Sequence, residues 1–166
     1  MQLQLSLTEA LWFLPFVAPI CGWVIYTDLS RMKITNHANL ALVGVFVLVG
    51  LLALPLDIYG WRLVQLLVVL VLGFVFNIMG LMGAGDSKFL AAAAPFIAPG
   101  DTVTVLFLLS IVTLTAIATH RWAKKTALRD MAPDWVSWTN AEKFPMGLAL
   151  GSTLVLYLVM GLIWGA

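Results

Sequence analysis

Residues 63–85, LVQLLVVLVLGFVFNIMGLMGAG, contain no charged side chain. Gln65 and Asn77 are the strongly polar side chains of this stretch. A helix that crosses a membrane needs ~20 predominantly apolar residues, and this stretch is long enough and apolar enough to supply them. It therefore predicts a transmembrane helix, and it decides the fold class of the chain.

The composition of the whole chain agrees with this prediction. Of its 166 residues, 62% are hydrophobic and 10% are charged, whereas a soluble domain carries roughly 25% charged residues. The chain has too little polar surface for a soluble globule or a disordered protein. Its net charge of +1 argues against binding to nucleic acid, and a single cysteine, Cys21, excludes a disulfide framework within the chain. We expect an all-α polytopic membrane protein with one domain, residues 1–166.

Further apolar stretches predict transmembrane helices at residues 10–27, 38–56, 102–119 and 144–166. A short, proline-interrupted fourth helix is expected at 86–98, which brings the number of crossings to six. A cleaved signal peptide is an alternative for the first stretch. Signal peptides begin with a positively charged region, and no Lys or Arg precedes Arg31, so we expect a true span.

The basic residues predict the orientation in the membrane. Six crossings place eight of the nine Lys and Arg residues on one side and only Arg62 on the other. Loops rich in Lys and Arg face the cytoplasm, so both termini are expected outside. The loop of residues 120–143 is expected to lie on the inner surface as an amphipathic segment.

Two acidic residues stand out because of their predicted depth. Asp28 and Asp86 each follow a span that runs from the outside to the inside, so both are expected at the cytoplasmic boundary. Two facing carboxylates share one proton, because ionising both is costly. The ionised carboxylate can deprotonate a water molecule while the protonated one polarises a carbonyl. This chemistry requires neither a metal nor a cofactor, and we expect none.

Simpler interpretations exist for the same residues. Asp86 could be a plain helix N-cap, and Asp28 could be an interfacial charge paired with Arg31 or Lys33. Lys88 could serve only the positive-inside charge bias. A small ion- or proton-coupled transporter is an alternative function, although its carboxylates would be expected nearer mid-membrane. A non-catalytic assembly subunit is a third.

Three motifs resemble those of the type IV prepilin peptidases, which are membrane aspartic peptidases with a GxGD motif. Residues 83–88, GAGDSK, resemble the family's GxGD-x-K motif. Residues 28–36, DLSRMKITN, resemble its first aspartate motif, in which Arg and then Ile-Pro-Asn follow the Asp. Residues 143–151, KFPMGLALG, are similar to its Pro-x-Gly-x-Ala-Leu-x-Gly stretch. Thr35 stands where the family often has Pro, and we expect a looser turn there.

The resemblance implies an endopeptidase that removes the short basic leader of type IV prepilin-like proteins. Cleavage would follow a Gly at the cytoplasmic edge of the substrate's apolar helix, in the bacterial cytoplasmic membrane. The implied catalytic residues are Asp28 and Asp86. The residues expected to shape the site around them are Gly83, Gly85, Lys88, Arg31 and Asn36.

The resemblance also indicates a subtype. Larger members carry an N-terminal region with paired Cys-x-x-Cys motifs and methyltransferase activity. With one cysteine and no such region, this chain resembles the short, peptidase-only members of tight-adherence (Flp) pilus systems. We therefore expect no methyltransferase activity.

Overall fold

A computed structural model describes residues 2–139 and 143–166. The described part of the chain is helical, and its only β contact is an isolated bridge between Leu3 and Gly165. The elements, in chain order, are α1 (Leu7–Arg31), α2 (Asn36–Ala53), α3 (Leu56–Ile78), α4 (Ala84–Ala93), η1 (Ala94–Phe96), η2 (Pro99–Asp101), α5 (Thr102–Ala123), η3 (Ala127–Met131), α6 (Val136–Thr139) and α7 (Met146–Trp164).

Five segments are long and apolar enough to cross a membrane, namely α1, α2, α3, α5 together with η2, and α7. They confirm the all-α polytopic fold. The fourth helix expected from the sequence is present as α4, but its ten residues extend only ~15 Å. This is half of the ~30 Å hydrocarbon core. Length and composition therefore assign five spans and leave α4 unassigned.

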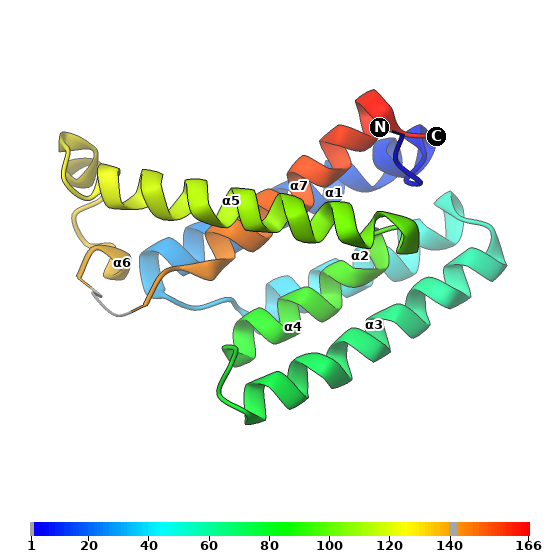
Figure 1. Ribbon diagram of the computed structural model, residues 1–166, viewed down its shortest axis with the longest axis horizontal. Helices are drawn as coiled ribbons and strands as arrows, with labels where there is room; N and C mark the ends of the chain where they lie inside the picture. Colours follow the sequence, from blue (N-terminus) through cyan, green and yellow to red (C-terminus); the bar gives the residue numbers. More distant parts are fainter. Residues whose placement is uncertain (1, 140–142) are drawn as a thin grey trace.

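The helices run back and forth between two ends of an elongated bundle (Figure 1). Both termini lie at one end, close to the bridge between Leu3 and Gly165. The central pair is α1 and α7, whose contact relies on small residues. A Cβ on Gly151 would lie 3.1 Å from the Cγ1 of Ile25 and 3.2 Å from the carbonyl oxygen of Cys21. Glycine thus lets the two helices approach closely, as is common between membrane helices.

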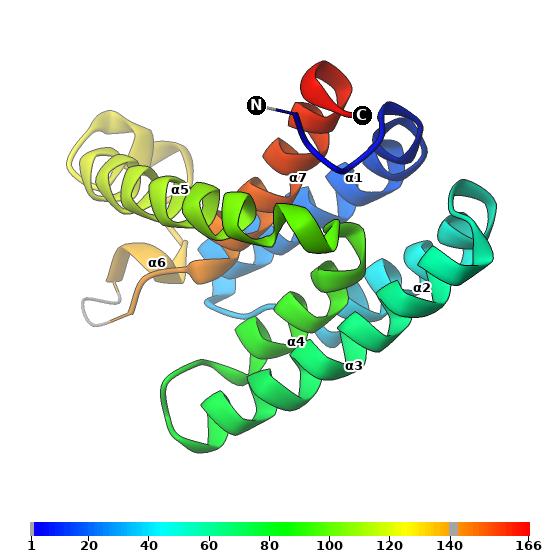
Figure 2. The same cartoon turned by 45° about the vertical axis from the view of Figure 1, so that its right-hand side comes forward.

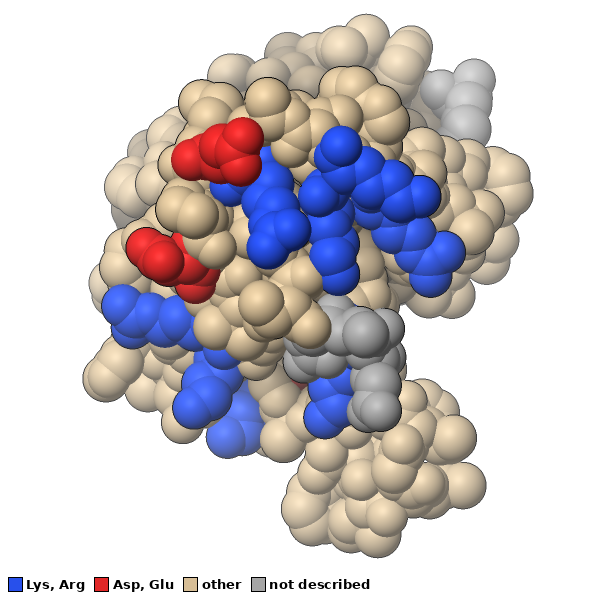
Figure 3. Space-filling view, turned by 90° about the vertical axis from the view of Figure 1, so that its left-hand side faces the viewer, with Lys and Arg blue, Asp and Glu red and all other residues tan. Residues whose placement is uncertain are grey.

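The end at which α1, α3 and α5 finish is strongly basic. Figure 3 views the molecule from this side and shows Lys and Arg side chains gathered over much of it. Arg31 in the last turn of α1 and Arg121 in the last turn of α5 belong to this end. We refer to it as the basic end. By the positive-inside rule it is expected to face the cytoplasm.

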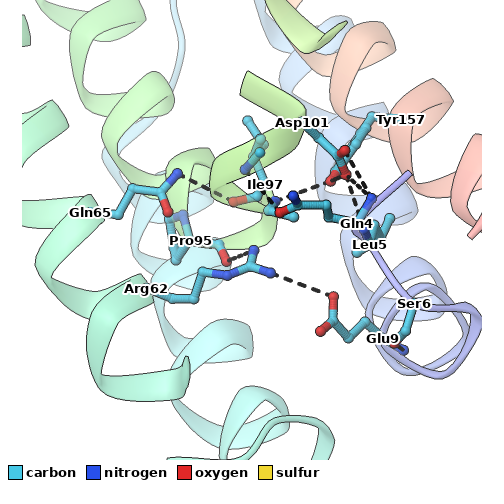
Figure 4. A network of polar contacts seen from close by, with 12 residues as sticks. Gln4, Leu5, Ser6, Glu9, Arg62, Gln65, Pro95, Ile97, Asp101 and Tyr157 are labelled. Atoms are coloured by element: carbon cyan, nitrogen blue, oxygen red, sulfur yellow. Dashed lines mark hydrogen bonds and ion pairs between the residues drawn. The ribbon is translucent and has the colours of Figure 1, made fainter. Parts of the chain in front are cut away.

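The opposite end is held by a buried polar network (Figure 4). The Asp101 carboxylate accepts hydrogen bonds from the backbone N–H groups of Gln4 and Leu5 and, at 2.8 Å, from the Tyr157 hydroxyl. The Nη2 atom of Arg62 lies 3.6 Å from the Oε2 atom of Glu9. The network joins the N-terminal segment to α3, α5 and α7, far from the basic end.

The structure corrects the expected helix boundaries around the glycine motif. The third span, expected to continue to residue 85, ends at Ile78. Gly80 has a φ of +71°, a left-handed conformation that ends the helix and that glycine adopts without strain. The Asn77 side chain then donates a 2.9 Å hydrogen bond to the carbonyl of Met82. Residues 79–83 therefore form a loop before α4.

The loop expected at residues 120–143 is built from short helical elements where it is described. It begins with the last turn of α5 and continues as the short elements η3 and α6. The Nε1–H of Trp138 donates to the carbonyl of Ala132 at 2.8 Å and closes this part of the chain on itself. Residues 140–142 of the expected segment lie outside the described residues.

Candidate active site

Asp28 lies in the last turn of α1, where it is 5% exposed. Its Oδ2 atom accepts a 2.6 Å hydrogen bond from the backbone N–H of Gly147, in the first turn of α7. A Cβ on Gly147 would lie 2.9 Å from both the Cβ and the Oδ2 of Asp28. Only glycine therefore lets α7 approach this carboxylate and bind it through the backbone.

Asp86 is the third residue of α4, and Gly83 is the N-cap of that helix. The interpretation of Asp86 as the N-cap is therefore wrong. Its carboxylate instead turns back toward Gly83, where an added Cβ would lie 2.7 Å from Oδ2, and it is hydrogen-bonded to the Gly83 backbone. An acidic residue at this position that binds the N-cap backbone forms one half of a capping box. Asp86 therefore stabilises the start of α4 in addition to being a candidate catalytic residue.

One cavity of about 340 Å³ has both aspartates in its wall. Asp28 reaches it from α1 and Asp86 from α4, with Met146 of α7 beside them. Lys33 and Lys143 add positive charge to the same wall. The segments that carry these side chains meet at the basic end, so the expectation that Asp28 and Asp86 share one depth agrees with the geometry.

The electrostatics of the cavity favour a shared proton. Asp86 lies outside the five spans, and its pKa is raised from 3.8 to about 6, chiefly because burial removes water from the carboxylate. The nearby charge of Asp28 raises it further, and the hydrogen bond to the Gly83 backbone opposes the rise. Two carboxylates so placed are stable with one proton between them.

The other expected site residues divide into two groups. Gly83 and Gly85 line the shared cavity, and a Cβ on Gly85 would lie 3.3 Å from the Cβ of Ile34. Lys88 and Asn36 lie elsewhere. The Nζ of Lys88 donates to the Oδ1 of Asn36 at 3.1 Å, and both line a separate cavity between α2, α3 and α4.

Arg31 is exposed at the end of α1 and does not line the shared cavity. Among the described residues, no ion pair joins Asp28 to Arg31 or Lys33. The interpretation of Asp28 as half of such a pair is therefore wrong. Its described partner is the Gly147 backbone.

Sequence reasoning missed the role of Gly147 and the two lysines of the cavity. Residues 143–151 were identified as a motif. The hydrogen bond from the backbone N–H of Gly147, however, cannot be predicted from side-chain chemistry. Thr35 was expected to loosen the turn before α2, but the structure shows a capping contact there. It caps α2 by accepting a hydrogen bond from the backbone N–H of Ala38, so this departure from the family pattern supplies a helix cap.

A pair of carboxylates beside a water-accessible cavity can perform general acid–base chemistry on a carbonyl. Within residues 2–139 and 143–166, His, Cys, Asp and Glu side chains form no group of three or more that could hold a metal ion.

Comparison with known families gives one match, to the type IV leader peptidase family over residues 16–119. The matched region is more than half of the chain and contains both Asp28 and Asp86. It ends before α7, so the contact from Gly147 lies outside it. Neither the curated proteins nor the solved structures give a match.

Proposed function

The chain belongs to the type IV leader peptidase family, and from this premise we propose that it is a membrane aspartic endopeptidase acting on prepilin-like proteins. The observation that carries the proposal is the cavity lined by both Asp28 and Asp86. The substrate would carry a short basic leader followed by an apolar helix. Cleavage would take place between the two, at the cytoplasmic face of the bacterial cytoplasmic membrane.

The environments of the two aspartates suggest their resting roles. A backbone N–H that donates to a carboxylate favours its ionised form, but both aspartates accept one, Asp28 from Gly147 and Asp86 from Gly83, so this contact does not distinguish them. The raised pKa of Asp86 favours its protonated form. Asp28 would then act as the general base and Asp86 as the general acid.

The proposed reaction conserves protons through one cycle. Asp28 accepts a proton from a water molecule, and the resulting hydroxide attacks the scissile carbonyl. Asp86 donates its proton to the carbonyl oxygen as the tetrahedral intermediate forms. Collapse of the intermediate breaks the C–N bond, and the proton held by Asp28 passes to the leaving amine. The proton of the intermediate's hydroxyl returns to Asp86, which restores the starting state.

The position of the aspartates also bears on the alternative of a transporter. Both lie at the basic end, whereas a transport path favours ionisable groups near mid-membrane. Family membership favours the peptidase independently. We therefore place the site at the cytoplasmic boundary, with no methyltransferase activity in this chain.

The test is cleavage by the purified protein in detergent or liposomes. The substrate is a synthetic prepilin-like peptide with a basic leader, a Gly and an apolar helix, and S-adenosylmethionine is present. We expect a product whose mass equals the substrate without its leader, with no added methyl group. An intact substrate under conditions in which the enzyme remains folded would contradict the proposal. A methylated product would contradict its peptidase-only part.

A further inference from the structure

A second cavity adjoins the site on its other side. Its volume is about 630 Å³, and its wall is mostly apolar. Leu90 of α4, Leu109 of α5 and Leu150 of α7 line it, together with Met82 from the loop before α4. We call this cavity the α4–α5 groove.

The groove exists because α4 and α5 diverge. The two helices come together through η1 and η2 at the far end and separate toward the basic end, as both ribbon views show (Figures 1 and 2). They make few direct contacts, whereas α7 packs against both. The opening is therefore a wedge between α4 and α5 with α7 as its floor.

The wedge narrows away from the basic end. Near its apex a cavity of only about 30 Å³ is left, lined by Ala93, Ile97 and Val105 among others. Leu90 and Leu109 line both this small cavity and the wide one. The space is thus wide beside Asp86 and closes toward the middle of the bundle.

The groove and the shared cavity meet at the candidate active site. Asp86 and Gly83 lie in the walls of both, as do Lys143, Phe144 and Met146. One side of Asp86 therefore faces a polar cavity with Asp28 and Lys33, and the other side faces a mostly apolar groove, with Lys143 in the walls of both. A substrate with a polar segment before its scissile bond and an apolar segment after it would match these two cavities.

We propose that the α4–α5 groove binds the first turns of the substrate's apolar helix, which enters sideways from the lipid between α4 and α5. This inference rests on the proposed function and adds to it the residues that select the substrate. Continuity with the cavity of the two aspartates favours a substrate over lipid as the occupant. Leu90, Leu109 and Leu150 are the contacts that would determine specificity.

The length of the groove limits what it can bind. From Asp86 to Ala93, at the apex, the rise along α4 is ~10 Å, or about two helical turns. Only the first two turns after the scissile bond can be enclosed, and the rest of the substrate helix stays in lipid. Apolar character in those two turns is therefore expected to matter more than in the remainder.

Cysteine cross-linking tests this placement directly. Leu109→Cys is made in an Asp28→Asn background so that the substrate stays intact, and Leu114→Cys is the matched control. Leu114 lies on the same helix, is 69% exposed and does not line the groove. The native Cys21 is fully buried and does not compete.

The substrate peptide carries one cysteine in the first turn after its scissile bond. We expect disulfide formation on mild oxidation with Leu109→Cys and only background with Leu114→Cys. Moving the substrate cysteine to the last turn of its helix should abolish the signal at Leu109. Equal cross-linking at both positions would overturn the proposal, because it would show no specific contact between the substrate and the groove.

An activity measurement provides a second arm. Leu109→Trp narrows the groove and should lower kcat/KM for the helix-bearing substrate about tenfold or more, as misfits in apolar pockets do. Leu114→Trp should have no effect. A wild-type rate for Leu109→Trp would contradict the inference, and loss of folding leaves the cross-linking arm to decide. If the wild-type protein cleaves no substrate, the proposed function fails, but the cross-linking experiment still shows whether a substrate helix binds in the groove.

Discussion

At the residue scale, the Asp28 carboxylate is placed by a backbone group of another helix. The N–H of Gly147 binds its Oδ2 at 2.6 Å, so the first turn of α7 controls the direction of the carboxylate. Because the donor is a backbone N–H, a substitution at this position disturbs the hydrogen bond by filling the space beside Gly147. This makes Gly147 a positioning residue and not a catalytic one.

Replacing Gly147 by Ala should therefore impair catalysis more than folding. The new Cβ would lie 2.9 Å from the Asp28 carboxylate and would push it aside, and misplacement by ~1 Å can cost about 10²-fold in rate. Steady-state cleavage and thermal unfolding in detergent measure the two effects. Gly22→Ala is the control, because a Cβ there meets nothing within 4 Å. Equal activity of the two variants would show that Asp28 is not held in this way.

A second prediction at this scale follows from the pKa of Asp86, which is raised from 3.8 to about 6. The folded protein holds this proton more tightly than the unfolded chain, so this group's contribution to stability falls as pH rises through that window. Asp86→Asn removes the contribution. Relative to wild type, the variant's melting temperature should rise between about pH 4 and about pH 7. A difference that does not change with pH would contradict the raised pKa.

The same titration should appear in the activity of the wild-type protein. Above about pH 6 the pair loses the proton that the general acid donates, so the cleavage rate should fall. The apparent pKa from such a profile belongs to the pair and not to Asp86 alone.

At the scale of the elements, the sequence predicted the long helices well. Runs of apolar side chains are a direct consequence of lipid contact, so four of the five spans appear where they were expected, with ends that shift by four residues or fewer. The third span, expected at 63–85, begins and ends seven residues earlier, at Leu56–Ile78. The end of α3 was predicted wrongly, because glycines and apolar residues continue the pattern beyond Ile78. The helix ends there through the backbone conformation of Gly80, which hydropathy does not record.

Side-chain pairings at the site were less predictable. The cavity with both aspartates agrees with an expectation drawn from helix direction alone, which sets their depth. The contact between Lys88 and Asn36 depends on the rotation of α4 about its axis. Lys88 lies two residues after Asp86 and so points away from it on a helix. Helical spacing could have shown this, whereas the Gly147 contact required the packing of α1 against α7.

The expectation that α4 is a short sixth crossing leads to a topological prediction. The apolar part of this helix, with η1 and η2, returns the chain from the basic end to the end that holds both termini. Reporter fusions at Ala166 should therefore report the outside, and fusions within η3 should report the cytoplasm. A cytoplasmic signal at Ala166 would exclude six crossings.

At the scale of the whole molecule, the two ends of the bundle have different tasks. The end with the termini is closed by the Asp101 network (Figure 4), in which one carboxylate accepts from Gln4, Leu5 and Tyr157. The basic end contains the two cavities that Asp86 lines and the divergence of α4 from α5. A far end held by these contacts can keep the helices in place while the basic end admits a substrate.

Loosening the far end should therefore reduce stability without changing the chemistry. Asp101→Asn replaces one acceptor oxygen by an NH₂ group facing backbone donors. It should cost about 2–3 kcal/mol, the scale of a hydrogen bond to a charged group. Tyr157→Phe removes fewer contacts and should cost less. Thermal unfolding measures both, with the cleavage rate followed at low temperature. An unchanged melting temperature for Asp101→Asn would refute the anchoring role.

The central claim is that Asp28 and Asp86 act together as one acid–base pair. Its most direct test is the cleavage rate of Asp28→Asn and Asp86→Asn, each checked for folding in detergent. Asn keeps the volume of Asp and can still accept the backbone hydrogen bonds, but it cannot exchange the proton. Asp57→Asn is the matched control, because Asp57 also lies in the first turn of a helix, but exposed and at the opposite end.

We predict that each site variant folds and loses activity by at least ~10²–10⁴-fold, and that the double variant is little worse than either single one, because the pair acts as a unit. Asp57→Asn should cleave at the wild-type rate. A folded Asp28→Asn or Asp86→Asn protein that cleaves its substrate at a rate near wild type would contradict the two-aspartate mechanism.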